Sequence, residues 1–339
     1  MNFLKALIME EKELRKLKKI KDIKEITSYI SSFYPDLNIS EYTIEEIEVA
    51  LVNTYIKIIG KILRYAPENM RLFLKDYLLK YEITNIKQLI LGSIVGIGVE
   101  EKEKNINFLV EEYLENSEFI RDLIAISSLD EIQFFMRGTK YNEAVREGII
   151  YFKNNNEVFV LEAFLDQLYY NNLIKKKKIF NKKERMLITL FVDYKTEIYN
   201  INMIYRGLKN KIDKKLLIQF LVKNYLFLDK QKIDYFLNLK TPEKFISELD
   251  DYLKKKKQIK LFYIPLKFKT KNFMKTIERF YINYYFKQFK IQIDDIESST
   301  IFKILEVLIL KEKEIWFDVL PHVVKIINDR FKVLKSYIK

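Results

Sequence analysis

Hydrophobic residues recur at helical spacing along nearly the whole chain. Segments 44–63, 70–81, 159–174 and 272–289 all show apolar positions three or four residues apart. In the first of them the stripe consists of Ile44, Ile47, Leu51, Tyr55, Ile58, Ile59 and Ile62. A period of 3.6 residues places such positions on one face of an α-helix. The pattern therefore predicts a chain of amphipathic helices.

Helix starts are marked by hydroxyl residues that precede acidic or apolar residues. Thr43 stands before IEEIE, Ser128 before LDEI, and Thr241 before Pro242. A Ser or Thr at this place accepts a hydrogen bond from a free backbone N–H of the first turn. Proline at the first helical position costs nothing, because that N–H has no helical partner. We expect helices to begin at these three places.

One short sequence occurs twice. EITNIKQLILG at 82–92 returns as EIYNINMIYRG at 197–207, which is 115 residues later. The shared positions are Glu82, Ile83, Asn85, Ile86 and Gly92 in the first copy and Glu197, Ile198, Asn200, Ile201 and Gly207 in the second. A third, weaker copy begins at Glu314 and Ile315, a further 117 residues on. We call these three stretches the repeated motif.

A second signature gives nearly the same interval. IKEITSYISSFY at 23–34 aligns with LDEIQFFMRGTK at 129–140 and more faintly with PEKFISELDDYL at 242–253, at intervals of 106 and 113 residues. Agreement between two signatures in order and spacing indicates an internal repeat. The sequence predicts three similar helical domains, at 1–110, 111–222 and 223–339.

Two residue types in the repeated motif have expected local roles. Asn85 and Asn200 lie beside the apolar face of their helices. Each either bonds a backbone carbonyl of a neighbouring helix or is an ordinary polar flank. Gly92 and Gly207 stand where a glycine commonly ends a helix, so we expect both to be C-caps.

Composition supports an all-α fold. The chain has 339 residues, 49% of them hydrophobic, which suffices for a packed core. Only seven glycines and five prolines occur, too few for the turns of an all-β protein. Cysteine is absent, which excludes disulfides and thiolate metal sites. The apolar stretch 89–99 is about half the length needed to span a bilayer, so a soluble or peripheral protein is expected.

The net charge of +13 widens the choice of partners. Nucleic acid, an anionic membrane surface and acidic proteins all suit a basic chain, and so does a general bias toward lysine. The lysine runs 175–178 and 254–257 are nucleic-acid contacts, solvated loops or helix ends, or contacts to a membrane or a partner.

Catalytic patterns are not evident. His322 is the only histidine, so a zinc site would depend on carboxylates almost alone. Gly96 and Gly98 are not followed by the Lys-Ser/Thr pair of a phosphate-binding loop. The sequence therefore predicts no catalytic residue, no metal and no cofactor.

Several stretches resemble the C subunit of archaeal-type rotary ATPases, which is equivalent to the d subunit of vacuolar ATPases. YLLKYEITNIKQLILG (77–92), LFVDYKTEIYNINMIYRG (190–207) and ILEVLILKEKEIWFDVL (304–320) resemble the three closing motifs of that family. SSLDEIQFFMRGTKY (127–141) is similar to the opening of its second repeat. Leu91 replaces the arginine common before the first motif's glycine, whereas Arg206 keeps it in the second.

The resemblance implies three helical-bundle domains in a pseudo-threefold funnel. Such a protein is a non-catalytic central-stalk rotor subunit, and it joins a shaft to a membrane ring for ion translocation. The implied partners are the D and F proteins of the shaft, the proteolipid ring (c/K) and, as a further candidate, the a/I protein of the stator. The implied location is peripheral, on the cytoplasmic face of the membrane, with no nucleic acid bound. Motif position makes Lys87, Arg206 and Lys311 candidate partner contacts.

Two other functions remain open from the residues alone. A basic helical-repeat scaffold that binds nucleic acid or another protein would place its lysines on one continuous concave face. An enzyme would show a pocket with converging polar groups.

Overall fold

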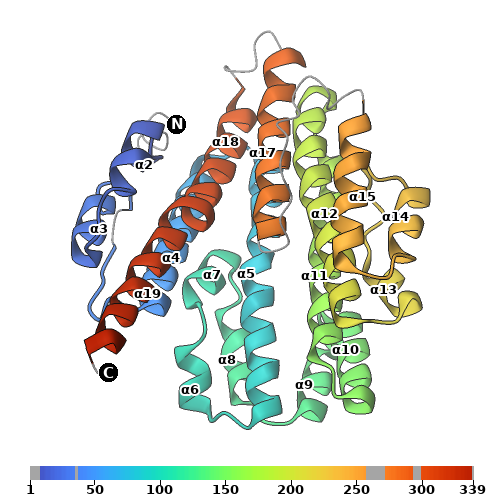
Figure 1. The fold of residues 1–339 in the computed structure, drawn as a ribbon. Coiled ribbons are helices and arrows are strands. Elements are labelled where there is room, and N and C mark those ends of the chain that lie inside the picture. Colours follow the sequence, from blue (N-terminus) through green and yellow to red (C-terminus); the bar gives the residue numbers. More distant parts are fainter. Residues whose placement is uncertain (1–7, 35–36, 257–271, 293–298, 338–339) are drawn as a thin grey trace. The chain divides into compact units, whose positions relative to one another are not determined.

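The structure is a computed structural model that describes residues 8–34, 37–256, 272–292 and 299–337. Across these ranges the regular elements are helices and no strand occurs (Figure 1). The predicted all-α class is confirmed. Two compact units are present, one formed by Met1–Arg71 with Glu297–Lys339 and the other by Leu72–Ile296. The three-domain pseudo-threefold arrangement, and its boundaries, stay a prediction.

The first unit joins the two ends of the sequence. Its helices are α2 (Glu11–Leu17), α3 (Ile23–Ile30), α4 (Ile44–Tyr65), α18 (Thr300–Lys313), the π-helical turn η5 (Glu314–Val319) and α19 (Leu320–Tyr337). α4 packs against α18 and α19, and α3 also packs against α19. Their apolar faces meet in a core that includes Ile26, Leu51 and Leu308.

The second unit is built around two long helices, α5 (Glu68–Val95), from Leu72 onward, and α12 (Lys182–Asn210). The other elements are α6 (Val99–Lys104), α7 (Phe108–Leu114), α8 (Ser117–Ala125), α9 (Leu129–Phe135), η1 (Met136–Gly138), α10 (Asn142–Asn155), α11 (Val158–Lys176), η2 (Lys177–Ile179), α13 (Lys214–Phe220), α14 (Lys230–Leu237), α15 (Pro242–Lys255) and α17 (Phe273–Gln292). α12 contacts α11, α13, α14, α15 and α17. Phe191 of α12 meets Phe73 and Tyr77 of α5 edge-on or tilted.

The predicted helix starts are confirmed. The hydroxyl oxygens of Thr43, Ser128 and Thr241 each accept the backbone N–H three residues on, at 3.1, 3.2 and 3.2 Å. Pro242 occupies the first turn of α15. Segment 70–81 and the first repeated motif form one 28-residue helix, because nothing between them breaks the pattern.

The expected C-cap role of Gly92 and Gly207 is wrong. Both lie inside the last turn of their helices, and the left-handed residues that end α5 and α12 come four positions later, at Gly96 and Lys211. A left-handed residue allows a later backbone N–H to bond back into the last turn. The carbonyl oxygens of Gly92 and Gly207 accept these bonds, at 2.8 and 2.9 Å.

What Gly207 requires is space. A Cβ atom there would lie within 2.9 Å of both methyl carbons of Leu217, a buried residue of α13. The bare backbone lets α13 approach α12 closely. At Gly92 the corresponding neighbour is the Lys102 side chain of α6, at 3.3 Å. The short helix that follows each copy therefore packs over its glycine.

Prediction on the α10–α11 contact: Gly148→Ala destabilises the protein. A Cβ at Gly148 would lie 2.8 Å from the Leu161 Cα, a backbone atom that cannot rotate away. Overpacking of this kind costs about 1–3 kcal/mol, which outweighs the gain in helix propensity. Urea unfolding measures the change. Gly138→Ala is the control, since nothing lies within 4 Å of its Cβ position. Equal stability of the two variants would contradict the close approach.

Candidate functional site

The glutamates that open the three copies of the repeated motif are all buried: Glu82, Glu197 and Glu314. A buried carboxylate is costly unless hydrogen bonds or an opposite charge compensate for lost water. The partners of these three side chains are therefore the central feature of the site.

Glu82 lies on α5 and is held by side chains. Its carboxylate accepts hydrogen bonds from the Tyr141 hydroxyl, from Asn116 Nδ2 at 2.6 Å and from Lys140 Nζ at 3.3 Å. Burial, followed by the Glu82 charge, raises the pKa of Tyr141 far above its ordinary value. The hydroxyl thus stays a donor to the carboxylate.

Glu197 lies on α12 and is held mainly by backbone. Its Oε2 atom accepts the N–H groups of Leu226, Phe227 and Leu228, at 2.8, 2.8 and 3.0 Å. Its Oε1 atom accepts the Tyr281 hydroxyl at 2.5 Å. Burial raises the pKa of Glu197, while these hydrogen bonds act in the opposite direction.

Glu314 forms a buried ion pair. Lys311 Nζ donates to its Oε1 at 2.7 Å, and the backbone N–H of Met9 donates to Oε2 at 2.8 Å. Lys311 also donates to the Phe33 carbonyl at 3.1 Å and lies 3.5 Å from the centre of the Tyr34 ring. Burial lowers the pKa of Lys311 to about 8.

Lys311 is engaged within the chain. Its side chain is 0% exposed, and its ammonium group is enclosed by Glu314, Phe33 and Tyr34. The lysine lies on the buried face of its helix, one turn before Glu314, and its role as a partner contact stays a prediction.

The three glutamates follow one order. Glu82 belongs to the first predicted domain, and its donors belong to the second. Glu197 belongs to the second, and its donors belong to the third. Glu314 belongs to the third, and Met9 and Tyr34, which lie next to it, belong to the first. Each predicted domain thus binds the next, and the last binds the first.

The first two copies of the repeated motif also share a pair of hydrogen bonds between an asparagine side chain and a later backbone. Asn85 exchanges two hydrogen bonds with the backbone of Asn107, at 3.0 and 3.1 Å, and Asn200 does the same with Val222, at 2.9 Å each. Both partners lie 22 residues after the asparagine. Each asparagine bonds a backbone carbonyl as expected, but the carbonyl belongs to a residue outside the helices and not to a neighbouring helix. The contact fixes the chain after each long helix.

Lys87 and Arg206 both bind acids of α11. Lys87 Nζ lies 2.6 Å from Asp166 Oδ1, and Arg206 Nη2 lies 3.4 Å from Glu162 Oε2. Their side chains are 16% and 37% exposed. As partner contacts they stay a prediction, and Arg206 has the more exposed side chain.

The lysine runs are partly engaged within the chain. Lys176 pairs with Asp76 at 3.6 Å, and Lys177 pairs with Asp193 at 2.8 Å. In the second run Lys254 pairs with Asp250 one turn earlier. Residue 257 lies outside the described residues. Such pairs reduce the charge that these runs offer to a nucleic acid.

The metal-ligating residue types are scattered. The described residues contain no group of three or more His, Asp or Glu side chains arranged to hold a metal ion. The His322 ring is used locally, with Nε2 2.9 Å from the Ile20 carbonyl oxygen. None of the described helices combines the length and the apolar character needed to cross a bilayer.

Comparison with known proteins identifies the family. The profile of the family described as ATP synthase (C/AC39) subunit matches residues 1–316, and the chain belongs to that family. It is similar to the C subunit of the A-type ATP synthase of Methanobrevibacter smithii, with 23% identity over 61% of this chain and 53% of the relative. The same protein of Methanosarcina acetivorans is 25% identical over 56% of this chain and 49% of the relative. The chain spans about half the length of the curated relatives it matches.

The sequence did not single out Tyr141 and Tyr281, which donate to the buried glutamates, or the buried acid Glu111. Tyr141 ends the Gly-Thr-x-Tyr stretch that carried part of the family resemblance, so its position was visible but its role was not. Glu111 sits in EEYLEN, where nothing distinguishes it from the exposed Glu112 beside it. Its carboxylate accepts a hydrogen bond from Asn85 at 2.6 Å inside the core.

Prediction on the tyrosines: Tyr141→Phe and Tyr281→Phe each lower the free energy of unfolding by about 1.5–3 kcal/mol, the usual worth of a hydrogen bond to a charged group. Tyr34→Phe changes it by less than about 0.5 kcal/mol, because the Tyr34 hydroxyl has no hydrogen-bond partner among the described residues. Urea unfolding of the three variants tests the difference. If Tyr34→Phe were as unstable as the other two variants, the wild-type Tyr34 hydroxyl would have a hydrogen-bond partner after all, and the neighbouring Glu314 would be that partner.

Prediction on pH: Glu111→Gln flattens the pH dependence of stability. Burial raises the pKa of Glu111 from 4.5 to about 8. Between these values the folded state binds more protons than the unfolded state, so stability falls as pH rises, by up to about 1.4 kcal/mol per pH unit. The amide removes this loss, so the variant exceeds the wild type in stability at pH 9. Urea unfolding of the wild type and the variant at pH 5, 7 and 9 measures the free energy of unfolding at each pH.

The control for this prediction is Glu112→Gln, which removes the same charge from an exposed neighbour. We expect this variant to keep the wild-type change of stability with pH. If Glu111→Gln kept that change as well, Glu111 would not be the group that titrates.

Proposed function

We propose that this chain is a non-catalytic rotor subunit of an A/V-type ATPase or ATP synthase. It acts as a socket that couples the D–F shaft to the proteolipid ring. Membership of the ATP synthase (C/AC39) subunit family carries the proposal. The chain works at the cytoplasmic face of the membrane, attached through its partners, and transmits torque during ion translocation.

The cyclic order of the glutamate contacts supports a socket built from three domains. A chain of three units linked only in series has two free ends. Here Glu314 meets Met9, so the third predicted domain is bonded back to the first. Lys18 and Asp318 add an ion pair at 3.1 Å to the same junction. The first unit thus holds the two ends of the sequence together, and separating them requires this junction to break.

The chemistry of the junctions also suits torque transfer. A stiff body needs contacts that do not slide, and hydrogen bonds to a buried carboxylate hold one geometry. Breaking one leaves an unpaired buried charge, which costs about 3–5 kcal/mol. The helices between the junctions are close-packed and transmit strain.

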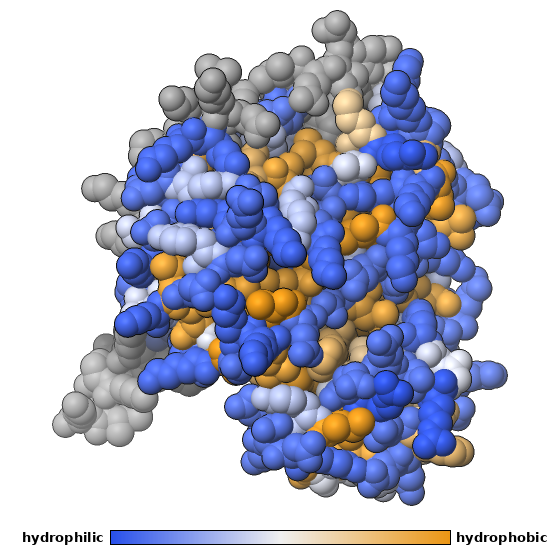
Figure 2. Space-filling view, turned by 90° about the vertical axis from the view of Figure 1, so that its right-hand side faces the viewer, coloured by the Kyte–Doolittle hydropathy of each residue, from blue (hydrophilic) through white to orange (hydrophobic). Residues whose placement is uncertain are grey.

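A basic scaffold for nucleic acid is the second candidate. The charge of +13 favours it. The face of the molecule seen in Figure 2 is largely hydrophilic, with hydrophobic side chains gathered in strips between the polar ones. Internal pairs of Lys176, Lys177 and Lys254 weigh against one continuous lysine surface. The rotor role is therefore better supported.

Prediction on function: the purified chain binds the D–F shaft and the proteolipid ring and hydrolyses no ATP by itself. Vesicles with the complex stripped of this chain hydrolyse ATP without pumping ions, and adding the chain restores ATP-driven ion uptake. Uptake is followed beside ATP hydrolysis, so that coupling is separated from catalysis. A heat-unfolded sample is the control. Recovery of nucleic acid in place of shaft and ring, or no restoration of uptake, would remove the proposal.

A further inference from the structure

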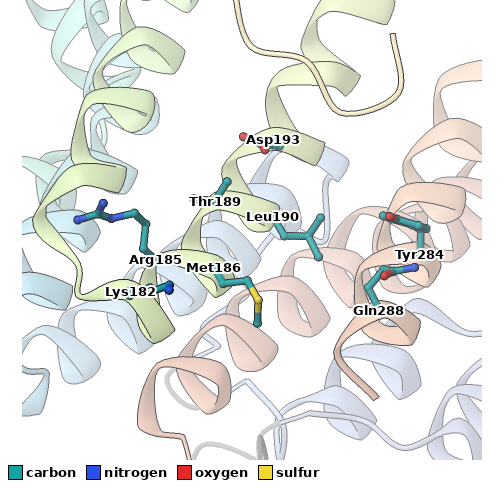
Figure 3. A pocket seen from close by; sticks show the side chains of 8 residues that line it. All are labelled: Lys182, Arg185, Met186, Thr189, Leu190, Asp193, Tyr284 and Gln288. Atoms are coloured by element: carbon teal, nitrogen blue, oxygen red, sulfur yellow. The ribbon is translucent and has the colours of Figure 1, made fainter. Parts of the chain in front are cut away.

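A pocket of about 380 Å³ lies between α12 and α17 in the second unit (Figure 3). One face of α12 forms one wall, with side chains three or four residues apart: Lys182, Arg185, Met186, Thr189, Leu190 and Asp193. Tyr284 and Gln288 reach in from α17. Its lining is mixed, with apolar surface from Met186 and Leu190 beside charged and polar side chains.

Tyr284 is an unusual member of this lining. Its side chain is only 7% exposed, and its ring packs edge-on against Phe227 with centroids 4.8 Å apart. Its hydroxyl has no hydrogen-bond partner within the described part of the chain, and Figure 3 shows the side chain directed toward Leu190. The Tyr284 hydroxyl is not one of the buried unpartnered atoms of the described residues, so it is accessible from the pocket that its side chain lines. An occupant that supplies an acceptor can take the place of water at this hydroxyl.

The charged residues around the pocket are not equivalent. Asp193 already accepts a hydrogen bond from Lys177 at 2.8 Å. Arg185 donates to the main-chain carbonyl of Phe180 at 2.8 Å. Lys182 is exposed and makes no ion pair with any described residue. One cation at the first turn of a long helix is thus left to attract an anion.

We propose that this pocket receives a segment of a protein partner that presents one large apolar side chain beside a carboxylate. The apolar side chain lies against Met186 and Leu190. The carboxylate meets Lys182, and an acceptor of the same segment takes the hydrogen bond of the Tyr284 hydroxyl. The chain's net charge of +13 also favours an acidic partner. The proposal rests on the proposed function, which supplies protein partners.

Thr189→Trp fills the pocket, and Tyr284→Phe removes only the unpartnered hydroxyl. Lys182→Glu reverses the free cation. The matched control is Lys183→Glu, the same charge change at an exposed neighbour outside the lining. Affinity is measured separately for the purified D–F shaft and the purified ring. We expect Thr189→Trp and Lys182→Glu to weaken one of them at least tenfold, Tyr284→Phe about five- to tenfold, and Lys183→Glu less than about twofold.

The outcomes separate the two proposals. If the wild type binds and all three pocket variants bind equally well, the pocket proposal is overturned and the rotor proposal is kept. Equal losses for Lys182→Glu and Lys183→Glu, with none for Tyr284→Phe, would mean general charge attraction and also overturn it. Failure of the wild type to bind shaft and ring would remove the rotor role and the pocket together. Tyr284→Phe changes one atom, so it decides the matter even if Thr189→Trp misfolds.

Discussion

A carboxylate buried inside a protein must be given hydrogen bonds by its neighbours, and this constraint organises the chain. Glu82, Glu197 and Glu314 each leave water at the same place in the repeated motif. The backbone of the surrounding helix cannot satisfy any of them, because its N–H groups are already used. Lys311, one turn away, supplies one donor to Glu314, and the other donors come from distant residues. These distant donors tie each long helix to a segment that follows it or, for Glu314, to the start of the chain.

The three junctions solve one problem with different chemistry. Side chains surround Glu82, backbone N–H groups surround Glu197, and an internal lysine neutralises Glu314. The third solution coincides with a π-helical turn over Glu314–Val319, whereas the corresponding parts of α5 and α12 are regular. π-turns often occur where a helix meets a functional demand. Here the turn lies where the two ends of the sequence are joined.

The same constraint explains which sequence features were misleading. Lys311 has the charge of a surface contact, but Glu314 one turn later makes it a buried partner. Gly92 and Gly207 have the look of helix ends, but the packing of α6 and α13 over them is what requires a residue without a side chain. In each case a local rule was applied to a residue whose environment is set by a distant segment.

Much of the architecture was decided by local and periodic signals. Apolar spacing and the caps at Thr43, Ser128 and Thr241 are properties of short windows, so the sequence alone established the helices and these starts. The 115-residue interval predicts a repeated unit. The tertiary structure decided which groups meet. Met9 lies 305 residues from Glu314, and Tyr281 lies 84 from Glu197. No periodicity encodes such pairs, because they depend on how helices pack after each has formed.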